Sequence, residues 1–477
     1  EMRLPNIFNY IEANSVTPTF ASNKISLDDD KRPLTTTEVR QCKNNQYLVY
    51  FGLIEEELDL IRTESVLKYI HQLYPVLNTK IVFDESIQWL RYEPQQEYPI
   101  TLQFEQQINS LDQMTTYVAK TDDYVCETHL THWQLANANI PELPAIKQIL
   151  MMYIPHAFGG GSTCSAIYSL FNRLYADRSL NFLQTPTPLQ KSFYRQIMSF
   201  NDQQVDVAPA SNFATQTKMT KISGDSEFNH SQIAAIPLEV KLVQQKDLAK
   251  IPGQTFSFSL NAILAAQYAA YAYFHGDLPV ENQFHVTFAE FKSSRDFLVK
   301  NGSIKDLDFD KTLGFDAYAV TFMVSGGLQT SLQDLLLQMD GCQKRFDEFG
   351  VEKQIKMFQQ QDYSQLLKNY PCGPVNFCAS NIGKNHLQEG PVVQIFGHTT
   401  IACPEGFPQM LMNCFSITSG KYGTAIVSMA MPELSSEKSR KHYDITIQAM
   451  AAVKERGATV KVEDIVKMYK DGFTELK

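Results

Sequence analysis

The sequence predicts an α/β fold, and three observations support this prediction. Residues 149–154 form an unbroken apolar run of strand length, which is typical of a strand covered on both faces. The run of glycines that begins at Gly159 then allows a tight turn. Apolar residues recur at helical spacing between Ala166 and Leu174, so this segment is expected to form a helix that packs on the sheet.

His156 stands between the strand and the glycines. The end of a strand is where α/β folds commonly place their chemistry, so His156 is the first candidate for a functional residue. Ser162 or Thr163 is available to cap the helix that follows. Tyr168 and Phe171, further along this helix, are expected in the core.

Other segments supply the remaining elements. Apolar residues at helical spacing over 60–73 predict a helix that stops at Pro75, where the chain enters a strand. Residues 260–274 are the longest apolar segment, but they fall short of the ~20 residues that span a bilayer, so a buried helix is expected. Alternation over 284–288 predicts a strand, and the spacing of apolar residues over 332–339 predicts a helix.

Composition indicates a protein with a sizeable core. The chain has 477 residues, of which 44% are hydrophobic and 20% are charged, and it can form two subdomains. A net charge of -10 argues against nucleic-acid binding, which needs a basic face. The 8 cysteines show no CxxC spacing and are interpreted as reduced, buried thiols. We therefore expect an intracellular protein, cytoplasmic or organellar (mitochondria included), and not a secreted one.

Motifs for three other kinds of site are incomplete. His129 and His132 form an HxxH pair, but no carboxylate or cysteine pattern completes a zinc site, so no metal is expected. No GxSxG motif accompanies the glycines, which disfavours a serine hydrolase. No lysine follows the glycines in the P-loop position, which excludes a P-loop nucleotide site.

The window from Pro155 to Gly161 resembles the HHxxxDG signature of an acyltransferase superfamily. This superfamily comprises chloramphenicol acetyltransferase, the condensation domains of nonribosomal peptide synthetases, alcohol acetyltransferases and polyketide-associated acyltransferases. His156 matches the second histidine of the signature, and Gly161 matches its final glycine. Pro155 stands in place of the first histidine, and Gly160 stands in place of the aspartate.

Further segments resemble the superfamily in the same order and extend the resemblance over most of the chain. They are the RPLT segment 32–35, the helix-to-strand segment 74–81, the central helix at 259–266, the "SNxG" strand at 380–383 and the closing hairpin over 410–431. The resemblance implies two lobes, each like one chloramphenicol acetyltransferase subunit with a mixed sheet and packed helices. The lobes would form a pseudo-dimer around a solvent tunnel.

The resemblance and the composition together predict the limits of the lobes. Residues 1–200 are expected to form the first lobe, and residues 256–477 the second. Residues 201–255 are rich in Asn, Gln, Ser and Asp and are expected to connect the two.

The implied reaction is acyl transfer from acyl-CoA, or another acyl thioester, to a hydroxyl or amine acceptor. His156 would act as general base, because an imidazole with a pKa of about 6.5 is largely neutral at cellular pH. Acyl-CoA is then a co-substrate, no cofactor is bound permanently, and no covalent intermediate on the protein is required. The expected partners are a small-molecule acyl donor and an alcohol or amine acceptor.

The resemblance also implies residues that line the tunnel. Gly160, Gly161 and Thr163 are expected beside the general base. Ser380 and Asn381, in the SNxG strand, are expected to polarise the thioester carbonyl or to shape its pocket. Ordinary strand-end hydrogen bonds would explain these two residues equally well.

A basic cluster near the C-terminus has two interpretations. Its members are Lys438, Arg440, Lys441 and His442. The cluster binds the phosphates of coenzyme A if it lies at a tunnel mouth. Otherwise it is a solvated helix face.

The departures from the signature leave a second function open. Gly160 removes an aspartate that, in the superfamily, pairs with an arginine and holds the turn, and it adds backbone freedom. Pro155 stiffens the approach to His156. The alternative to a working enzyme is therefore a pseudoenzyme, a catalytically inactive protein that serves as a scaffold or as a subunit of a larger complex.

Overall fold

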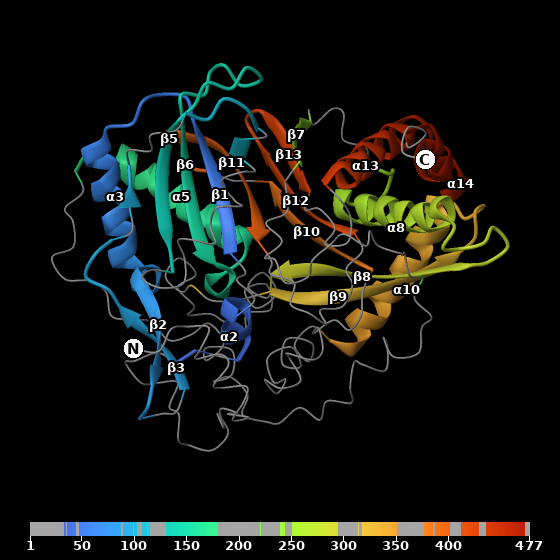
Figure 1. Cartoon of the computed structure of the whole chain (residues 1–477), viewed down its shortest axis with the longest axis horizontal. Coiled ribbons are helices and arrows are strands. Elements are labelled where there is room, and N and C mark those ends of the chain that lie inside the picture. The colour runs from blue at the N-terminus through green and yellow to red at the C-terminus, as the bar shows by residue number, and fades with distance from the viewer. Residues whose placement is uncertain are drawn as a thin grey trace.

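The structure is a computed structural model with two lobes side by side (Figure 1). It describes residues 33–34, 36–43, 47–86, 89–98, 100–102, 107–111, 113–114, 130–179, 220, 239–243, 250–293, 313, 317–350, 376–384, 387–400, 412–428 and 436–472.

The first lobe is built on a five-stranded sheet with the strand order β11-β1-β6-β5-β4. The strands are β1 (Tyr47–Ile54), β4 (Ile100–Thr101), β5 (His132–Asn137), β6 (Gln148–Pro155) and β11 (Val392–Thr400). Helices α3 (Leu60–Leu73) and α5 (Gly161–Ala176) pack on one face, and loop residues cover the other. Every residue of β6 is buried, which confirms the strand predicted over 149–154. Tyr168 and Phe171 of α5 are fully buried, as predicted.

The second lobe is built on a six-stranded sheet with the strand order β7-β13-β12-β10-β8-β9. The strands are β7 (Glu239–Val243), β8 (Phe284–Ser293), β9 (Ala317–Gly326), β10 (Phe377–Lys384), β12 (Met412–Gly420) and β13 (Gly423–Ser428). Its helices are α8 (Phe256–His275), α10 (Leu332–Phe349), α13 (Ser436–Arg456) and α14 (Val462–Gly472), with a short 3-10 helix, η5 (Gly457–Thr459). Helix α8 lies between the sheet and the pair α13 and α14, in one continuous core. The strand predicted over 284–288 and the helix predicted over 332–339 are confirmed.

Helix α8 is the buried helix that the sequence predicts. The Thr255 hydroxyl accepts a hydrogen bond from the Phe258 backbone N–H and caps the first turn. Gly276 has a φ of 89° and ends the helix in the left-handed conformation. In the described part of the chain, no helix is both long and apolar enough to cross a membrane.

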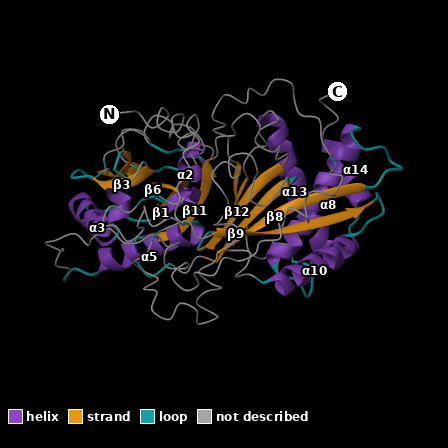
Figure 2. Cartoon of the chain, turned by 90° about the horizontal axis from the view of Figure 1, so that it is seen from below, coloured by secondary structure: helices purple, strands orange, loops and turns teal. Residues whose placement is uncertain are grey.

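The two halves of the sequence share the first sheet. Strand β11 comes late in the chain, yet it pairs antiparallel with β1 over the register Tyr47↔Thr400 to Ile54↔Val392. It also packs beside β12 of the second sheet, so the two sheets meet at this strand (Figure 2). Strand β7 lies within the segment expected to connect the lobes and pairs with β13. The lobe limits at 200 and 256 stay a prediction.

A two-stranded hairpin, β2 (Thr79–Asp84) and β3 (Trp89–Pro94), completes the first lobe. It follows a short 3-10 helix, η1 (Pro75–Asn78), which begins at the proline that ends α3. The order of helix, proline and strand is therefore as predicted. The apolar face of the hairpin, including Leu90 and Tyr92, is buried.

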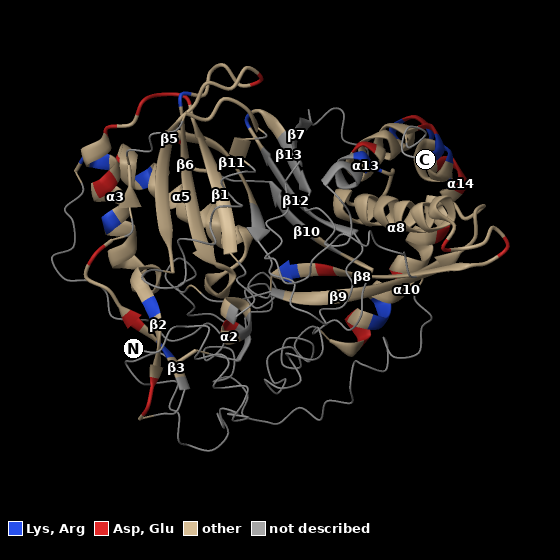
Figure 3. Ribbon diagram, viewed as in Figure 1, with Lys and Arg blue, Asp and Glu red and all other residues tan. Residues whose placement is uncertain are grey.

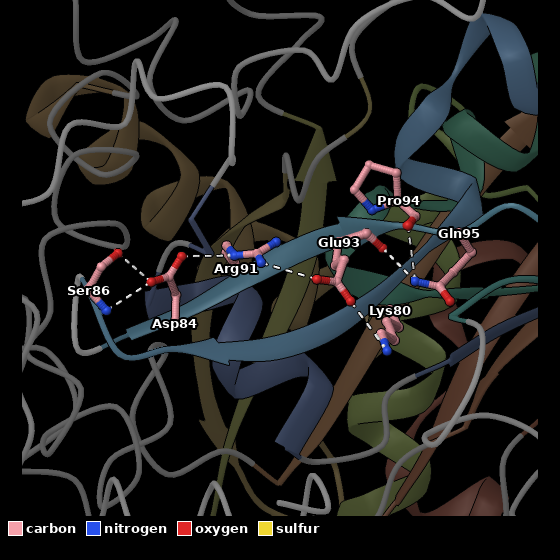
Figure 4. Close-up of polar contacts among 7 residues, drawn as sticks. All are labelled: Lys80, Asp84, Ser86, Arg91, Glu93, Pro94 and Gln95. Carbon is pink, nitrogen blue, oxygen red and sulfur yellow. Dashed lines mark hydrogen bonds and ion pairs between the residues drawn. The ribbon is translucent and has the colours of Figure 1, made fainter. Parts of the chain in front are cut away.

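The other face of the hairpin carries a ladder of ion pairs (Figure 4). Arg91 donates from Nε to the carboxylate of Asp84 at 2.9 Å and from Nη2 to Glu93 at 3.1 Å. Lys80 lies 3.3 Å from the same Glu93. Cross-strand pairs of opposite charge favour a single strand register, so this ladder holds β3 in place.

Candidate active site

The turn between β6 and α5 carries His156. Strand β6 ends at Pro155, a 3-10 helix, η3 (His156–Phe158), follows, and α5 begins at Gly161. Pro155 is opposite Tyr47 of β1, whereas the pairing of β5 with β6 stops at Tyr153. A proline is tolerated at the end of a strand because few ladder hydrogen bonds are lost there. Proline in place of the first signature histidine is thus compatible with the strand that positions His156.

The backbone of the turn orients the His156 ring. Its Nδ1 lies 2.9 Å from the carbonyl oxygen of Gly159. A carbonyl oxygen only accepts hydrogen bonds, so Nδ1 carries a proton. When the ring is neutral, the lone pair is therefore on Nε2. The ring is half-buried. A neutral imidazole in this tautomer is suited to take a proton at Nε2.

The glycines of the turn have separate structural roles. Gly159 has a φ of +152°, and a Cβ at this position would lie 2.2 Å from Oγ1 of Thr163. Only glycine fits this approach between the turn and the helix. Gly160 occupies the N-cap of α5, and no side chain caps the helix. The prediction that Ser162 or Thr163 is the cap is wrong, because the helix already begins at Gly161.

The Thr163 side chain lies against the turn that carries His156, as its position in the sequence predicts. Thr163 is only 5% exposed, and its Oγ1 has no hydrogen-bond partner in the part of the chain that the structure describes. The hydroxyl occupies the space that a Cβ atom on Gly159 would fill. A buried hydroxyl without a partner is uncommon in folded proteins, and this one borders the turn that carries the candidate base.

Two elements pack against the turn, and the sequence analysis predicted neither of them. Helix α2 (Thr36–Lys43) contacts η3 and buries the polar side chains of Glu38 and Gln41. From β3, the Tyr92 ring lies 5.5 Å from the Phe158 ring, centroid to centroid. The only sequence signal for α2 is its position directly after the RPLT segment, since a polar helix of 8 residues has a weak apolar pattern.

Ser380 and Asn381 lie in the second lobe. Strand β10, which contains them, is parallel to both of its neighbours, β12 and β8. Ser380 is in register with Phe291 on one side and with Ser416 on the other. The SNxG segment is therefore a strand, as predicted. The side chains of Ser380 and Asn381 are outside the described residues, so their role stays a prediction.

The basic cluster lies on α13, which packs against α8 and α14. Helix α13 belongs to the second lobe, whereas α2, which contacts the His156 turn, belongs to the first (Figures 1 and 2). The structure describes the side chain of Lys441 but not those of Lys438 and Arg440. His442 is fully buried, and its Nδ1 lies 2.7 Å from the Tyr469 hydroxyl, so it does not belong to a solvated face.

A cluster of polar side chains lies where α8 meets β8. The Ser257 hydroxyl donates a hydrogen bond to the carboxylate of Glu290, and Lys292 lies 3.7 Å from the same carboxylate. Figure 3 shows these opposite charges on β8, whereas β1 and β6 carry none. Glu290 is in register with Ala379, the residue before Ser380. No motif in the sequence indicated this group, because its members are distant in sequence.

Among the described residues, no three or more His, Cys, Asp or Glu side chains gather as a metal site would require. His129 of the HxxH pair lies outside the described residues, and His132 is on β5. Three of the cysteines, Cys42, Cys164 and Cys342, are buried free thiols. Burial raises the pKa of the Cys164 thiol well above its usual range, so this neighbour of Thr163 is a poor nucleophile.

No protein-family model matches the sequence, and no curated protein matches it. Solved structures do match. A chain from the complex of the X-domain and OxyB from teicoplanin biosynthesis is 11% identical, with a TM-score of 0.55 over 92% of this chain and 98% of that one. Polyketide synthase associated protein 5 from Mycobacterium tuberculosis is 12% identical, with a TM-score of 0.59 over 89% of this chain and 98% of that one.

A mutant of the starter condensation domain of rhizomide synthetase RzmA, in complex with C8-CoA and Leu-SNAC, is a third match. It is 13% identical, with a TM-score of 0.58 over 90% of this chain and 96% of that one. At these identities the likeness establishes the fold. The two-lobed fold of condensation domains and related acyltransferases, predicted from the sequence, is confirmed over most of the chain.

Proposed function

We propose that the protein transfers an acyl group from acyl-CoA, or another acyl thioester, to a hydroxyl or amine acceptor, with His156 as general base. The observation that carries this proposal is the hydrogen bond from His156 Nδ1 to the Gly159 carbonyl, which leaves the lone pair on Nε2. The condensation-domain fold supports it, and so does the neighbour whose structure contains C8-CoA and Leu-SNAC.

The proposed reaction is direct transfer. Nε2 of His156 takes the proton of the acceptor O–H or N–H as the acceptor atom attacks the thioester carbonyl. A bond forms between the acceptor and the carbonyl carbon, and a tetrahedral intermediate results. The carbon–sulfur bond then breaks, and the departing thiolate takes the proton back from His156. The thioester is already activated, so holding donor and acceptor together supplies much of the acceleration.

The other predicted residues have supporting roles in this proposal. Thr163 Oγ1 is a donor for the oxygen of the tetrahedral intermediate. Ser380 and Asn381 are candidates for the same role from the second lobe. Lys438, Arg440 and Lys441 are retained as candidates for the phosphates of coenzyme A, although they lie on a different lobe from His156.

The test is turnover of acetyl-CoA and octanoyl-CoA, followed as thiol release in the presence of alcohol and amine acceptors. His156→Ala should abolish release, while binding of the thioester by calorimetry should persist. His275→Ala is the matched control, because this histidine lies at the end of α8 beside Asp277. Equal turnover in the wild type and in His156→Ala would refute the role of His156.

A second candidate function is that of an inactive scaffold or complex subunit. One neighbour comes from a complex of the X-domain with OxyB, and Gly160 replaces the signature aspartate in this chain. The scaffold function predicts neither thioester binding nor turnover, together with a stable protein complex. Copurification from the native source, followed by identification of the bound protein, separates the two functions.

A further inference from the structure

Two buried polar side chains near the His156 turn each have an oxygen that lacks a hydrogen-bond partner among the described residues. Thr163 is 5% exposed and Gln41 is 7% exposed, and among the described residues neither Thr163 Oγ1 nor Gln41 Oε1 has a hydrogen-bond partner. Folded proteins satisfy most of their buried polar groups, because a buried group without a hydrogen bond has lost its bonds to water without replacing them. Two such groups at one turn need an explanation.

The two side chains reach the turn from different elements. Thr163 is in the first turn of α5 and touches Gly159, at the end of η3. Gln41 is on α2, which packs against η3 itself. Val39 and Cys42 of α2 join the core cluster that contains Ala157 and Phe158 of η3. Gln41 therefore belongs to an element that packs directly on the segment that carries His156.

The chemistry of Gln41 indicates the class of ligand. A glutamine side chain ends in an amide, which both donates and accepts hydrogen bonds. The group that complements it fully is another amide, which offers one N–H and one C=O. The pantetheine arm of every CoA thioester carries amides a few bonds from the sulfur, and the same arm links acyl groups to carrier proteins.

We propose that the Gln41 amide binds an amide of the pantetheine arm, that the Thr163 oxygen accepts a hydrogen bond from the same arm, and that these contacts position the thioester at His156. This inference rests on the proposed acyl transfer for its place in a reaction, but it predicts binding that does not depend on turnover. Gln41 would be a positioning residue for the donor, on a helix that the HHxxxDG signature does not include.

The test measures dissociation constants of S-acetylpantetheine and acetyl-CoA by calorimetry with the full chain. Loss of two neutral hydrogen bonds should weaken binding of both ligands about tenfold in Gln41→Leu. Thr163→Val should weaken it less, and Thr163→Ser should restore it. Gln72→Leu is the matched control, because Gln72 is a partly buried glutamine on α3. Thermal unfolding identifies any variant that fails to fold. If Gln41→Leu fails, Gln41→Glu replaces it, because glutamate keeps the shape of the side chain but lacks the amide N–H donor.

The outcomes separate this inference from the proposed function. Binding of S-acetylpantetheine that is unchanged in Gln41→Leu and in Gln41→Glu overturns the inference, even if the wild type turns over. An effect on acetyl-CoA alone also overturns it, because the contact would then lie elsewhere on coenzyme A. Binding that depends on Gln41 without any turnover supports the inference and refutes only the acyl transfer. A carrier-bound donor is supported if acetyl-CoA binds no more tightly than S-acetylpantetheine.

Discussion

The Tyr422 hydroxyl donates a hydrogen bond to the carboxylate of Glu55. Tyr422 lies in the turn between β12 and β13, and Glu55 directly follows β1. Lys421 reaches the same carboxylate, with its Nζ 2.6 and 2.8 Å from the two oxygens. The turn that joins two strands of the second sheet is therefore tied to the end of β1 in the first sheet, and this contact resists separation of the lobes.

Removing the Tyr422 hydroxyl tests the strength of this contact. In Tyr422→Phe the ring can still pack on the first lobe's core, but Glu55 loses one of its donors. The Glu55 side chain is 31% exposed, so solvent reduces the cost, and we expect the free energy of unfolding to fall by about 1 kcal/mol. Urea denaturation measures the change. Tyr422→Phe in a Glu55→Gln background should cost clearly less, and an equal cost would show that the two residues are not coupled.

The same pair predicts how stability depends on pH. Hydrogen bonds from Lys421 and then from Tyr422 lower the pKa of Glu55 below its usual 4.5, so the stability that Glu55 contributes is present above that value and is lost as pH falls. Burial and then the hydrogen bond to Glu55 raise the pKa of Tyr422 from 10.0 to about 12. Its contribution is therefore complete below pH 10.0 and is lost as pH rises towards 12.

The difference in unfolding free energy between the wild type and Tyr422→Phe should therefore be constant near neutral pH and shrink above pH 10.0. Urea titrations at several pH values measure it. A difference that grows with alkaline pH would contradict the raised pKa of Tyr422.

Gly159 tests the geometry of the His156 turn. In Gly159→Ala the new methyl group meets Thr163 Oγ1 at 2.2 Å and the backbone keeps an unfavourable positive φ. We expect a loss of stability of about 2 kcal/mol, together with at least a tenfold fall in thioester turnover, because the carbonyl that orients His156 moves. Gly327→Ala is the control, because no atom lies within 4 Å of the added carbon. A variant with unchanged stability and turnover would show that the turn does not depend on this glycine.

The secondary structure around His156 could be predicted from short sequence patterns, because the burial and the backbone limits of one segment determine its own pattern of residues. The apolar run at 149–154 required a strand covered on both faces, and β6 is such a strand. Pro75 required an end to the preceding helix, and α3 ends just before it. The helix cap was predicted wrongly, because the start of α5 depends on the path of Gly159 and Gly160, which spacing alone does not fix.

The parts that sequence reasoning missed depend on contacts between distant segments. Nothing within β11 indicates that it pairs with β1, more than 300 positions earlier by the register Tyr47↔Thr400. The burial of Gln41 depends on helix α2 docking on η3, and a polar helix carries little signal for that contact. The tautomer of His156 depends on one carbonyl three positions later, which only coordinates reveal.

Asn172 provides the last test, because it connects the helix of the candidate active site to the strand from the second half of the chain. Its amide donates to the carbonyl oxygens of Gln388 and Val392, both at 2.8 Å, and its Oδ1 accepts from the Val392 N–H at 2.9 Å. Asn172→Ala leaves both backbone groups of Val392 buried without these partners, so we expect a loss of about 3 kcal/mol. Ser169→Ala removes one exposed hydrogen bond, which the Ser169 hydroxyl oxygen accepts from the Gln388 N–H, and should cost about 0.5 kcal/mol. Urea denaturation with hydrogen exchange at β11 measures both variants. If Asn172→Ala unfolds like Ser169→Ala and β11 stays protected, the ladder with β1 alone holds this strand, and α5 is not coupled to the second half of the chain.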